Sequence, residues 1–462
     1  MRTAAVICEL NPLHNGHALL FSEAKRLCGA DFLIAIMSGN FVQRGEPAVF
    51  DKFIRAEMAL LAGADLVIEL PPLFAMSSAR EFARAGVTAA EKTGVTDILA
   101  FGAEGTAPDE TSARSAQIQK NADFSDEIEQ PSAFLAADET ASEQKLLRQL
   151  QAAANMLPET ESAEFQAELR RELKKGQSYP KARMAALRAQ IEDEQKCGAQ
   201  TEGIFERPNN LLAIEYLRVL HASGSRIAPL AVQRRGDGYH AAAACDKVYA
   251  SATALRAFLF AARKENGHLT EEEKTFLAKY CPREVLPLYE KALSGPLASA
   301  ELLSPLLNQR ILEISSGRGR FADFTAYSDM PPALSDRLMK NAGRITGFSG
   351  RVQQLKTRQY TQTRITRALL HVALGVEVEE LARQKNAGYV QYLRILGFRQ
   401  SAAALLAELK KNAAVPIVTK PAAHKDLIGQ DAFYDQLYYA LLADGAARMR
   451  SEYEHSPIIL PD

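Results

Sequence analysis

Cysteine is scarce in this sequence and is not grouped. The chain of 462 residues contains five cysteines. None belongs to a CxxC pair, and the closest two, Cys8 and Cys28, stand twenty residues apart. Zinc sites and disulfide frameworks use closely spaced cysteines, so the sequence argues against both. Cys8 lies in an apolar run, which is typical of a small buried side chain.

Long uninterrupted apolar runs are also missing. No stretch reaches the ~18 uncharged apolar residues of a membrane-spanning helix, and the apolar run at the N-terminus is too short for a signal peptide. We therefore expect a cytoplasmic protein without a membrane partner. Net charge is nearly absent as well, at -1 for the whole chain. Nucleic-acid binding would then have to come from a local patch.

Short apolar runs alternate with helical patterns in the N-terminal part. Buried strands are predicted by the apolar runs at 4–8, 32–37, 66–70 and 98–101. Helical spacing at 17–27 and 56–62 places helices between them. This alternation predicts an α/β fold with a doubly wound parallel sheet, a Rossmann-type core. The sheet is expected to resume at 227–232, and the chain from about 250 onward to be almost entirely helical.

Charge is distributed unevenly along the chain. Residues 101–160 carry 11 Asp/Glu against 4 Lys/Arg, which predicts an acidic helical insertion at about 105–165. Residues 331–420 carry 15 Lys/Arg against 5 Asp/Glu, a bias that favours nucleic-acid binding over a solvated helix face. We therefore expect a catalytic domain at 1–260 and a basic, mainly α-helical, nucleic-acid-binding domain at 261–462.

The motif His14-Asn15-Gly16-His17 directly follows the first predicted strand. A strand, a tight turn and a helix start gather backbone N–H groups where a phosphate fits, and Gly16 permits close approach. Each histidine can donate a hydrogen bond to a phosphate oxygen on which charge builds. A doubly wound sheet binds its nucleotide at this position. We therefore predict a phosphate site with His14 and His17 as catalytic residues; the alternative is a helix cap beside a surface histidine.

A second motif, Ser251-Ala252-Thr253-Ala254-Leu255-Arg256, has the pattern of a helix start. Ser251 or Thr253 can cap the helix, and the Arg256 guanidinium one turn later can grip two phosphate oxygens. Taken alone, the motif is better explained as a capped surface helix with an exposed arginine. Together with the first motif, it resembles the HIGH-type nucleotidylyltransferase superfamily, whose members cleave ATP between the α- and β-phosphates.

Further blocks narrow this resemblance. They are Glu9–His17, Met37–Ala48, Gly176–Pro180, Pro208–Ala213, Gln233–His240 and Lys356–Arg364. In this order through most of the chain, they resemble the tRNA(Met) cytidine acetate ligase family. The resemblance implies that ATP and acetate give acetyl-adenylate. The acetyl group then passes to the wobble cytidine of elongator tRNA(Met), giving N4-acetylcytidine.

The resemblance also implies an ATP site. Its continuous part comprises Ile7, Cys8, Glu9, Leu10, Asn11, Pro12, Leu13, His14, Asn15, Gly16, His17, Ala18, Leu19 and Leu20. Further contacts are implied from Gly102, Asn209 and Arg234, with Asn210 and Arg235 as alternatives one residue away. The second motif adds Ser251, Thr253 and Arg256.

Acetate is already ionised at neutral pH, so the enzyme has to hold it in line with the α-phosphate. The loop at 38–47 is our candidate for one wall of the acetyl pocket. Magnesium is expected to enter with the triphosphate, because no dedicated carboxylate cage for a metal is visible. The residues expected to hold the substrates are His14, His17, Arg234 and Arg256, with Lys52 as a further candidate.

The basic region is expected to hold the tRNA backbone, with an aromatic ring available for stacking. The residues expected there are Lys356, Arg358, Tyr360, Arg364 and Arg367. Two other functions remain possible. A small-molecule adenylyltransferase, joining ATP to a phosphorylated cofactor precursor, would share both phosphate motifs but not need the basic half. A non-catalytic RNA-binding protein would not need His14, Gly16, His17 and Arg256. The sequence does not predict an oligomeric state.

Overall fold

The computed structural model describes most of the chain. The described residues are 1–105, 133–157, 163–175, 177, 182, 185, 186, 189, 203–205, 207–234, 250–263, 269–442 and 451–462. The acidic stretch at 106–132 lies outside them, as does most of the motifs at 176–180 and 233–240. Arg235, the alternative to Arg234, is among the residues left out.

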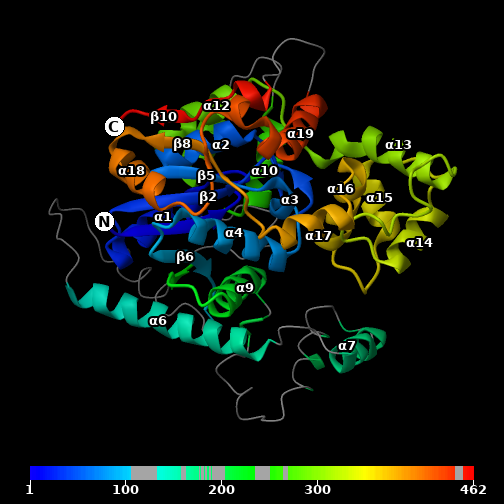
Figure 1. Cartoon of the computed structure of the whole chain (residues 1–462), viewed down its shortest axis with the longest axis horizontal. Coiled ribbons are helices and arrows are strands. Elements are labelled where there is room, and N and C mark those ends of the chain that lie inside the picture. The colour runs from blue at the N-terminus through cyan, green and yellow to red at the C-terminus, as the bar shows by residue number, and fades with distance from the viewer. Residues whose placement is uncertain are drawn as a thin grey trace.

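A single large sheet forms the centre of the molecule (Figure 1). Its strands are β1 (Thr3–Cys8), β2 (Phe32–Ser38), β5 (Leu66–Leu70), β6 (Ile98–Ala103), β7 (Ala228–Gln233), β8 (Leu393–Arg399), β9 (Ile417–Val418) and β10 (Ile458–Leu460). The order is β10-β8-β5-β2-β1-β6-β7, with β9 paired to β8. Strands β5, β2, β1, β6 and β7 are parallel to one another. A separate hairpin consists of β3 (Phe41–Val42) and β4 (Glu46–Pro47).

Helices cover both faces of this sheet. The α-helices are α1 (Asn15–Cys28), α2 (Lys52–Leu61), α3 (Pro72–Ala75), α4 (Ala79–Thr93), α6 (Ala133–Met156), α7 (Ala163–Lys174), α9 (Pro208–Ala222), α10 (Ala252–Ala262), α11 (Glu271–Tyr280), α12 (Leu286–Leu293), α13 (Ser304–Ser315), α14 (Pro332–Lys340), α15 (Phe348–Leu355), α16 (Gln362–Leu374), α17 (Val378–Asn386), α18 (Ala403–Asn412) and α19 (Lys425–Leu442). Short 3₁₀ helices are η1 (Arg283–Val285), η2 (Ala300–Leu303), η3 (Gln400–Ala402), η4 (Pro421–His424) and η5 (Glu452–Glu454).

Strand β1 shows why the sheet is covered on both sides. All six of its residues are buried, as expected for a central parallel strand. Successive side chains point to opposite faces: Ala5 and Ile7 pack in one core with α4, α6, α9 and α18. Ala4, Val6 and Cys8 pack in a second core with α1, α2, α10, α11 and α12. The predicted α/β fold class is thus confirmed, and Cys8 is a buried core residue.

The C-terminal third differs from the prediction of an almost entirely helical region. Strands β8, β9 and β10 come from this third and join the edge of the sheet, where β8 runs antiparallel to β5. Arg394 interrupts the short apolar run of β8, which hid the strand in the sequence. Its guanidinium is buried and lies 2.9 Å from Glu452, a partner 58 residues away. The sheet therefore draws on both ends of the chain.

A helical lobe lies at one end of the molecule, away from both termini (Figure 1). It contains α13, α14, α15 and α16 around a third apolar core, which includes Leu307, Leu334, Phe348 and Leu369. The acidic insertion is helical where it is described. The buried face of α6, with Leu146 and Leu150, packs in the same core as α9. Among the helices of the described residues, none combines the length and apolar character needed to cross a membrane.

Candidate functional site

The two histidines form the N-terminal cap of α1. His14 has an extended backbone, and its Nδ1 accepts a hydrogen bond from the Gly16 amide at 3.1 Å. The His14 amide donates to His17 Nδ1 at 3.3 Å, so the two residues make a reciprocal capping box. Their ring centroids are 4.0 Å apart. The helix-cap interpretation is therefore correct for His14, but the cap uses only one nitrogen of each ring.

The cap fixes the tautomer of both rings. Because each Nδ1 accepts a backbone N–H, the proton of a neutral ring resides on Nε2. Burial, with the positive charge of Arg234, lowers the pKa of His17 to about 3. Burial also lowers the pKa of His14 well below its usual range, and His17 and Arg234 add to this effect. At neutral pH the turn therefore presents two neutral Nε2–H donors.

Contacts from distant parts of the chain hold this turn in place. Tyr289 in α12 donates its hydroxyl to the carbonyl of Leu13. The side-chain Nδ2 of Asn15 donates to the carbonyl of Lys279 at 3.0 Å, near the end of α11. Neither Tyr289 nor Lys279 belongs to a motif, so sequence reasoning missed them.

Arg234 lies close enough to both histidines for its charge to act on them, and Gly102 lies beside Arg234. Strand β1 pairs with β2 on one side and β6 on the other, so the strand order reverses at β1, where an open α/β sheet binds its ligand. Gly102 lies in β6, and a Cβ there would approach Arg234 Cγ at 3.2 Å. The Arg234 amide donates to the carbonyl of Ala103 at 2.8 Å. The structure thus brings these predicted residues together.

The two neighbouring asparagines differ. Asn210 is fully buried. Its Oδ1 accepts a hydrogen bond from the backbone N–H of Glu104 at 2.8 Å, and its Nδ2 donates to the carbonyls of Glu104 and Ile204 at 2.9 and 3.1 Å. These contacts give Asn210 a structural role at the start of α9. The side chain of Asn209 lies outside the described part, so its contact with ATP stays a prediction.

The second motif packs directly against the turn after β1. Ser251 caps α10, accepting a hydrogen bond from the Ala254 amide at 3.1 Å. Arg256 is not an exposed surface arginine: its side chain is 14% exposed, and Nη1 donates to the carbonyl of Asn11 at 2.7 Å. Its Nη2 lies 3.4 Å from Glu46 Oε1 in β4. The fold therefore joins Arg256 of the second motif to Asn11 in the turn after β1, 245 residues earlier in the sequence.

The loop at 38–47 borders the same region, as the candidate wall requires. The Gln43 amide donates to Glu9 Oε1 at 2.6 Å, and burial raises the pKa of the Glu9 carboxyl. Asn11 Nδ2 and Ser38 Oγ are buried without a hydrogen-bond partner among the described residues. Asn11 lies in the chain just beyond β1, and Ser38 is the last residue of β2. Unpartnered buried polar atoms are rare in proteins, so both are candidates for contacts with a ligand.

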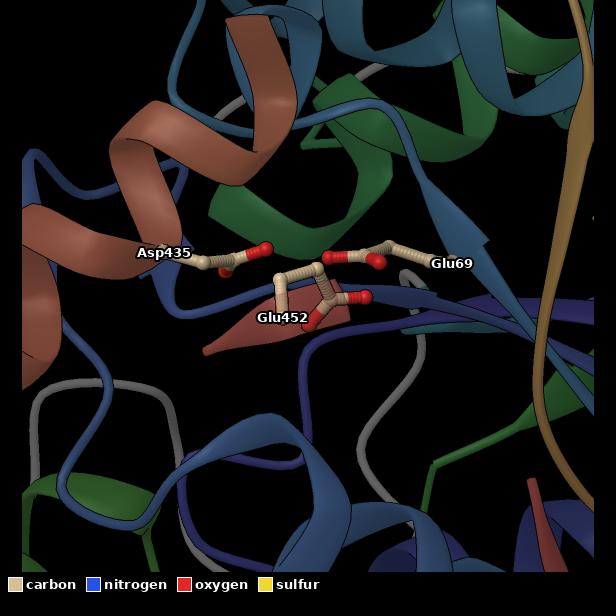
Figure 2. A group of neighbouring side chains, drawn as sticks. All are labelled: Glu69, Asp435 and Glu452. Carbon is tan, nitrogen blue, oxygen red and sulfur yellow. The ribbon is translucent and has the colours of Figure 1, made fainter. Parts of the chain in front are cut away.

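Lys52 does not hold a substrate. Its Nζ is buried among three carboxylates, at 2.8 Å from Glu69, 2.5 Å from Asp435 and 3.1 Å from Glu452. Figure 2 shows these three acids pointing toward one another from β5, α19 and η5. A buried charge needs opposite charges around it, and this requirement fixes Lys52 in a structural role.

The same three carboxylates have the composition of a metal site. One oxygen of each lies within 4.8 Å of the others. However, the Lys52 ammonium group already supplies the cation, and burial raises the pKa of Glu69 and Asp435 despite it. The cluster therefore does not fit a resident divalent ion.

The residues expected to bind tRNA divide into two groups. Lys356 and Arg358 are exposed, and the Arg364 guanidinium lies over the Tyr360 ring, 5.4 Å from its centroid. Arg367 is a correction to the expected surface position. It is buried, and its Nε lies 2.8 Å from Asp329 Oδ2.

Further exposed basic side chains accompany Lys356 and Arg358 on the helical lobe. None of them forms an ion pair with another described residue. This set, called the basic face below, comprises Arg337, Lys340, Arg344, Lys356 and Arg358. It lies on α14 and on the segments around α15.

Comparisons with known proteins agree with this geometry. The family model described as HIGH Nucleotidyl Transferase matches residues 1–136 and 139–454. A tRNA(Met) cytidine acetate ligase of Thermoanaerobacter sp. (strain X514) is 30% identical over 446 residues, covering 95% of this chain and 94% of that protein. One from Lysinibacillus sphaericus (strain C3-41) is 29% identical, covering 99% and 100%.

The chain belongs to the tRNA(Met) cytidine acetate ligase family. It is therefore an enzyme of this type, as the resemblance in sequence implied. Among solved structures, Thermotoga maritima TmcAL bound with alpha-thio ATP has a TM-score of 0.77 and 27% identity, with both chains covered completely. The apo form of TmcAL has a TM-score of 0.78 and 26% identity. The similarity thus extends over the sheet and the helical lobe.

Replacement of His17 by alanine tests the phosphate site. We expect at least a ~100-fold loss of acetate-dependent pyrophosphate exchange into ATP, the scale for one transition-state donor. Loss of the reciprocal cap costs about 1 kcal/mol, so circular dichroism should show a folded protein. Ser22→Ala, an exposed position on α1, is the matched control. Near-normal exchange in His17→Ala would restrict the histidine to capping.

Replacement of Lys52 by methionine tests the structural assignment. The substitution leaves buried carboxylates without their cation. Urea unfolding at pH 7 should therefore show a free energy of unfolding that is about 3–5 kcal/mol lower than that of the wild type. The loss should shrink toward pH 5, because the unpaired carboxyls of the variant take up protons as it folds. Lys25→Met removes a partly exposed pair with Asp65 and should cost about 1 kcal/mol or less. A Lys52→Met variant as stable as wild type would contradict the assignment.

Proposed function

We propose that this enzyme uses ATP to activate acetate as acetyl-adenylate and transfers the acetyl group to the wobble cytidine of elongator tRNA(Met), giving N4-acetylcytidine. The single observation that carries the proposal is the convergence of two neutral histidine donors with Arg234 and Arg256 around the switch point of the sheet. The names of the relatives and the alpha-thio ATP bound to Thermotoga maritima TmcAL support the same chemistry.

In the first step, an acetate oxygen attacks the α-phosphorus, and the bond to the β-phosphate oxygen breaks to release pyrophosphate. Both reactants are anions, so the main tasks are alignment and charge stabilisation. The Nε2–H groups of His14 and His17 donate to phosphate oxygens without carrying a charge of their own. Arg234 supplies positive charge beside them, and Arg256 fixes the turn through the Asn11 carbonyl. We place the acetyl pocket along the loop at 38–47.

In the second step, the exocyclic amine of cytidine attacks the acetyl carbonyl carbon. A C–N bond forms, the bond to the AMP phosphate oxygen breaks, and the amine loses a proton. The tRNA backbone is held on the basic face, where charge attracts phosphate independently of sequence. Tyr360 and Arg364 next to it offer a stacking surface for an unpaired base.

The basic face favours this function over the alternatives. An adenylyltransferase for a phosphorylated cofactor precursor needs the phosphate motifs but not an exposed basic surface on a separate helical lobe. A non-catalytic RNA-binding protein needs the face but not the arrangement of His14, His17 and Arg256. Magnesium is proposed only as a companion of the triphosphate. The carboxylate cluster around Lys52 does not fit the ion, so no step is assigned to it.

Pyrophosphate exchange tests the chemistry directly. Because acetyl-adenylate forms on the enzyme, acetate should drive the exchange of labelled pyrophosphate into ATP. Mass spectrometry of nucleosides should then show N4-acetylcytidine in tRNA(Met) incubated with enzyme, ATP and acetate. Acetyl-CoA without ATP should not support the reaction. Efficient acetylation from acetyl-CoA alone would refute the mechanism.

A charge-removing triple variant tests the location of the tRNA. Replacing Arg344, Lys356 and Arg358 by alanine should weaken tRNA binding and lower its salt dependence by about one unit for each lost phosphate contact. Acetate-dependent exchange should stay close to wild type. The matched control replaces the exposed Lys410 and Lys411 of α18 and the exposed Lys420 after β9; α18 lies at the opposite end of the molecule from the helical lobe in Figure 1. Equal tRNA affinity in both triple variants would place the RNA elsewhere.

A further inference from the structure

The β3–β4 hairpin contacts helices of both functional regions. Its tip consists of Gln43, Arg44 and Gly45. The hairpin contacts α10, which begins with the second phosphate motif. It also contacts α16, which follows the segment of Lys356 and Arg358 in the basic face.

The contact with α16 is made at backbone level. Gly45 has a φ of +82°, and a Cβ there would lie 2.3 Å from the backbone nitrogen of Arg367. No side chain fits between the hairpin and the helix. Thr366 Oγ1 lies 2.5 Å from the carbonyl oxygen of Arg44 and 2.9 Å from that of Thr363, and its single proton is directed to the nearer Arg44 oxygen. Because no flexible side chain separates the two backbones, the hairpin tip must follow the position of α16.

Two side chains of the hairpin contact the start of α10. Arg44 Nη1 donates to Thr253 Oγ1 at 3.2 Å. Glu46 Oε1 lies 3.4 Å from Nη2 of Arg256. Thr253 and Arg256 belong to the motif assigned to the phosphate site, so the hairpin contacts two side chains of that motif.

The hairpin also contacts the chain that leads into the histidine turn. The Gln43 amide donates to Glu9 Oε1 at 2.6 Å, immediately after β1. Arg256, which pairs with the hairpin, donates to the carbonyl of Asn11 at 2.7 Å. A displacement of the hairpin would therefore reach the histidine turn through two contacts, one at Glu9 and one at Arg256.

Buried polar contacts hold helix α16 against its neighbours. Arg367 pairs with Asp329 at 2.8 Å. Both ring nitrogens of the fully buried His371 contact carbonyl oxygens, those of Ser328 and Met76, at 3.0 and 2.9 Å. Such a helix transmits displacement rather than absorbing it.

We infer that the β3–β4 hairpin couples tRNA docking on the basic face to the geometry of the ATP site, with Gly45 and Thr366 as positioning residues. The inference rests on the proposed function, which assigns these two sites to ATP and tRNA. By thermodynamic linkage, bound RNA then changes nucleotide affinity, and bound nucleotide changes RNA affinity by the same factor.

The test measures this factor at equilibrium in the full-length enzyme. The nucleotide probe is the non-hydrolysable α,β-methylene ATP. The RNA probe is an elongator tRNA(Met) transcript with uridine at the wobble position, which lacks the acceptor amine. The measured quantity is the ratio of the nucleotide Kd without RNA to the Kd with saturating RNA. Since both values come from one variant, a general change in affinity cancels.

In the wild type, the ratio of the two Kd values should differ from one by about 5-fold or more, in either direction, as is typical of coupled sites. Thr366→Val, which removes the hydroxyl but keeps the shape, should bring the ratio within about 2-fold of unity. Thr363→Val, the same substitution one turn earlier on α16, should keep the wild-type ratio. Thr366→Ser, which retains the hydroxyl, should restore it and serves as the readout if the valine variant does not fold.

Two outcomes would overturn the inference: a wild-type ratio of one, or a Thr366→Val ratio equal to that of the wild type. Failure of the proposed function is distinguishable from both. It would appear as absence of acetate-dependent exchange and of N4-acetylcytidine in the wild type, measured in the same preparation with native tRNA.

Discussion

The guanidinium group of Arg55 holds the carboxyl ends of β1 and β2 together. Arg55 belongs to α2 and is completely buried. Its guanidinium donates to the carbonyls of Glu9, Ser38, Gly39 and Phe50. Strand ends leave carbonyls without ladder partners, and buried polar groups need partners. The histidine turn and the β3–β4 hairpin both leave the sheet at this point, so their relative placement depends on Arg55.

A second buried cation on α2 ties the ends of the chain together. Lys52 lies one turn before Arg55 and binds Glu69 from the N-terminal half and Asp435 and Glu452 from the C-terminal part. Arg394 of β8 pairs with Glu452 in the same cluster. Replacing either cation alone would leave buried partners uncompensated. Strand β8, which follows the helical lobe along the chain, and α19 are thereby anchored to α2 and β5 of the N-terminal half.

Local patterns were sufficient to predict the helix starts of the two motifs but not their surroundings. The histidine turn and the Ser251 cap are encoded within a few residues, so their backbone geometry could be predicted. Arg367 and Lys52 were misjudged because charge in the sequence does not reveal a buried partner, here Asp329 and the three carboxylates. Strand β8 was missed for the same reason at Arg394. Tyr289, which supports the turn, carries no sequence signal because its role depends on tertiary contact alone.

The central claim is that His14 and His17 act on phosphate as neutral rings with the proton on Nε2. Nitrogen-15 NMR of histidine-labelled enzyme, titrated from pH 5 to pH 8 with and without alpha-thio ATP, tests this most directly. The account predicts an Nε2–H tautomer for both rings and no protonation of His17 in this range, since its pKa lies at about 3. Nucleotide should shift the two Nε2 resonances. A titration of either ring near pH 6.5, or Nε2 resonances that ignore the nucleotide, would contradict it.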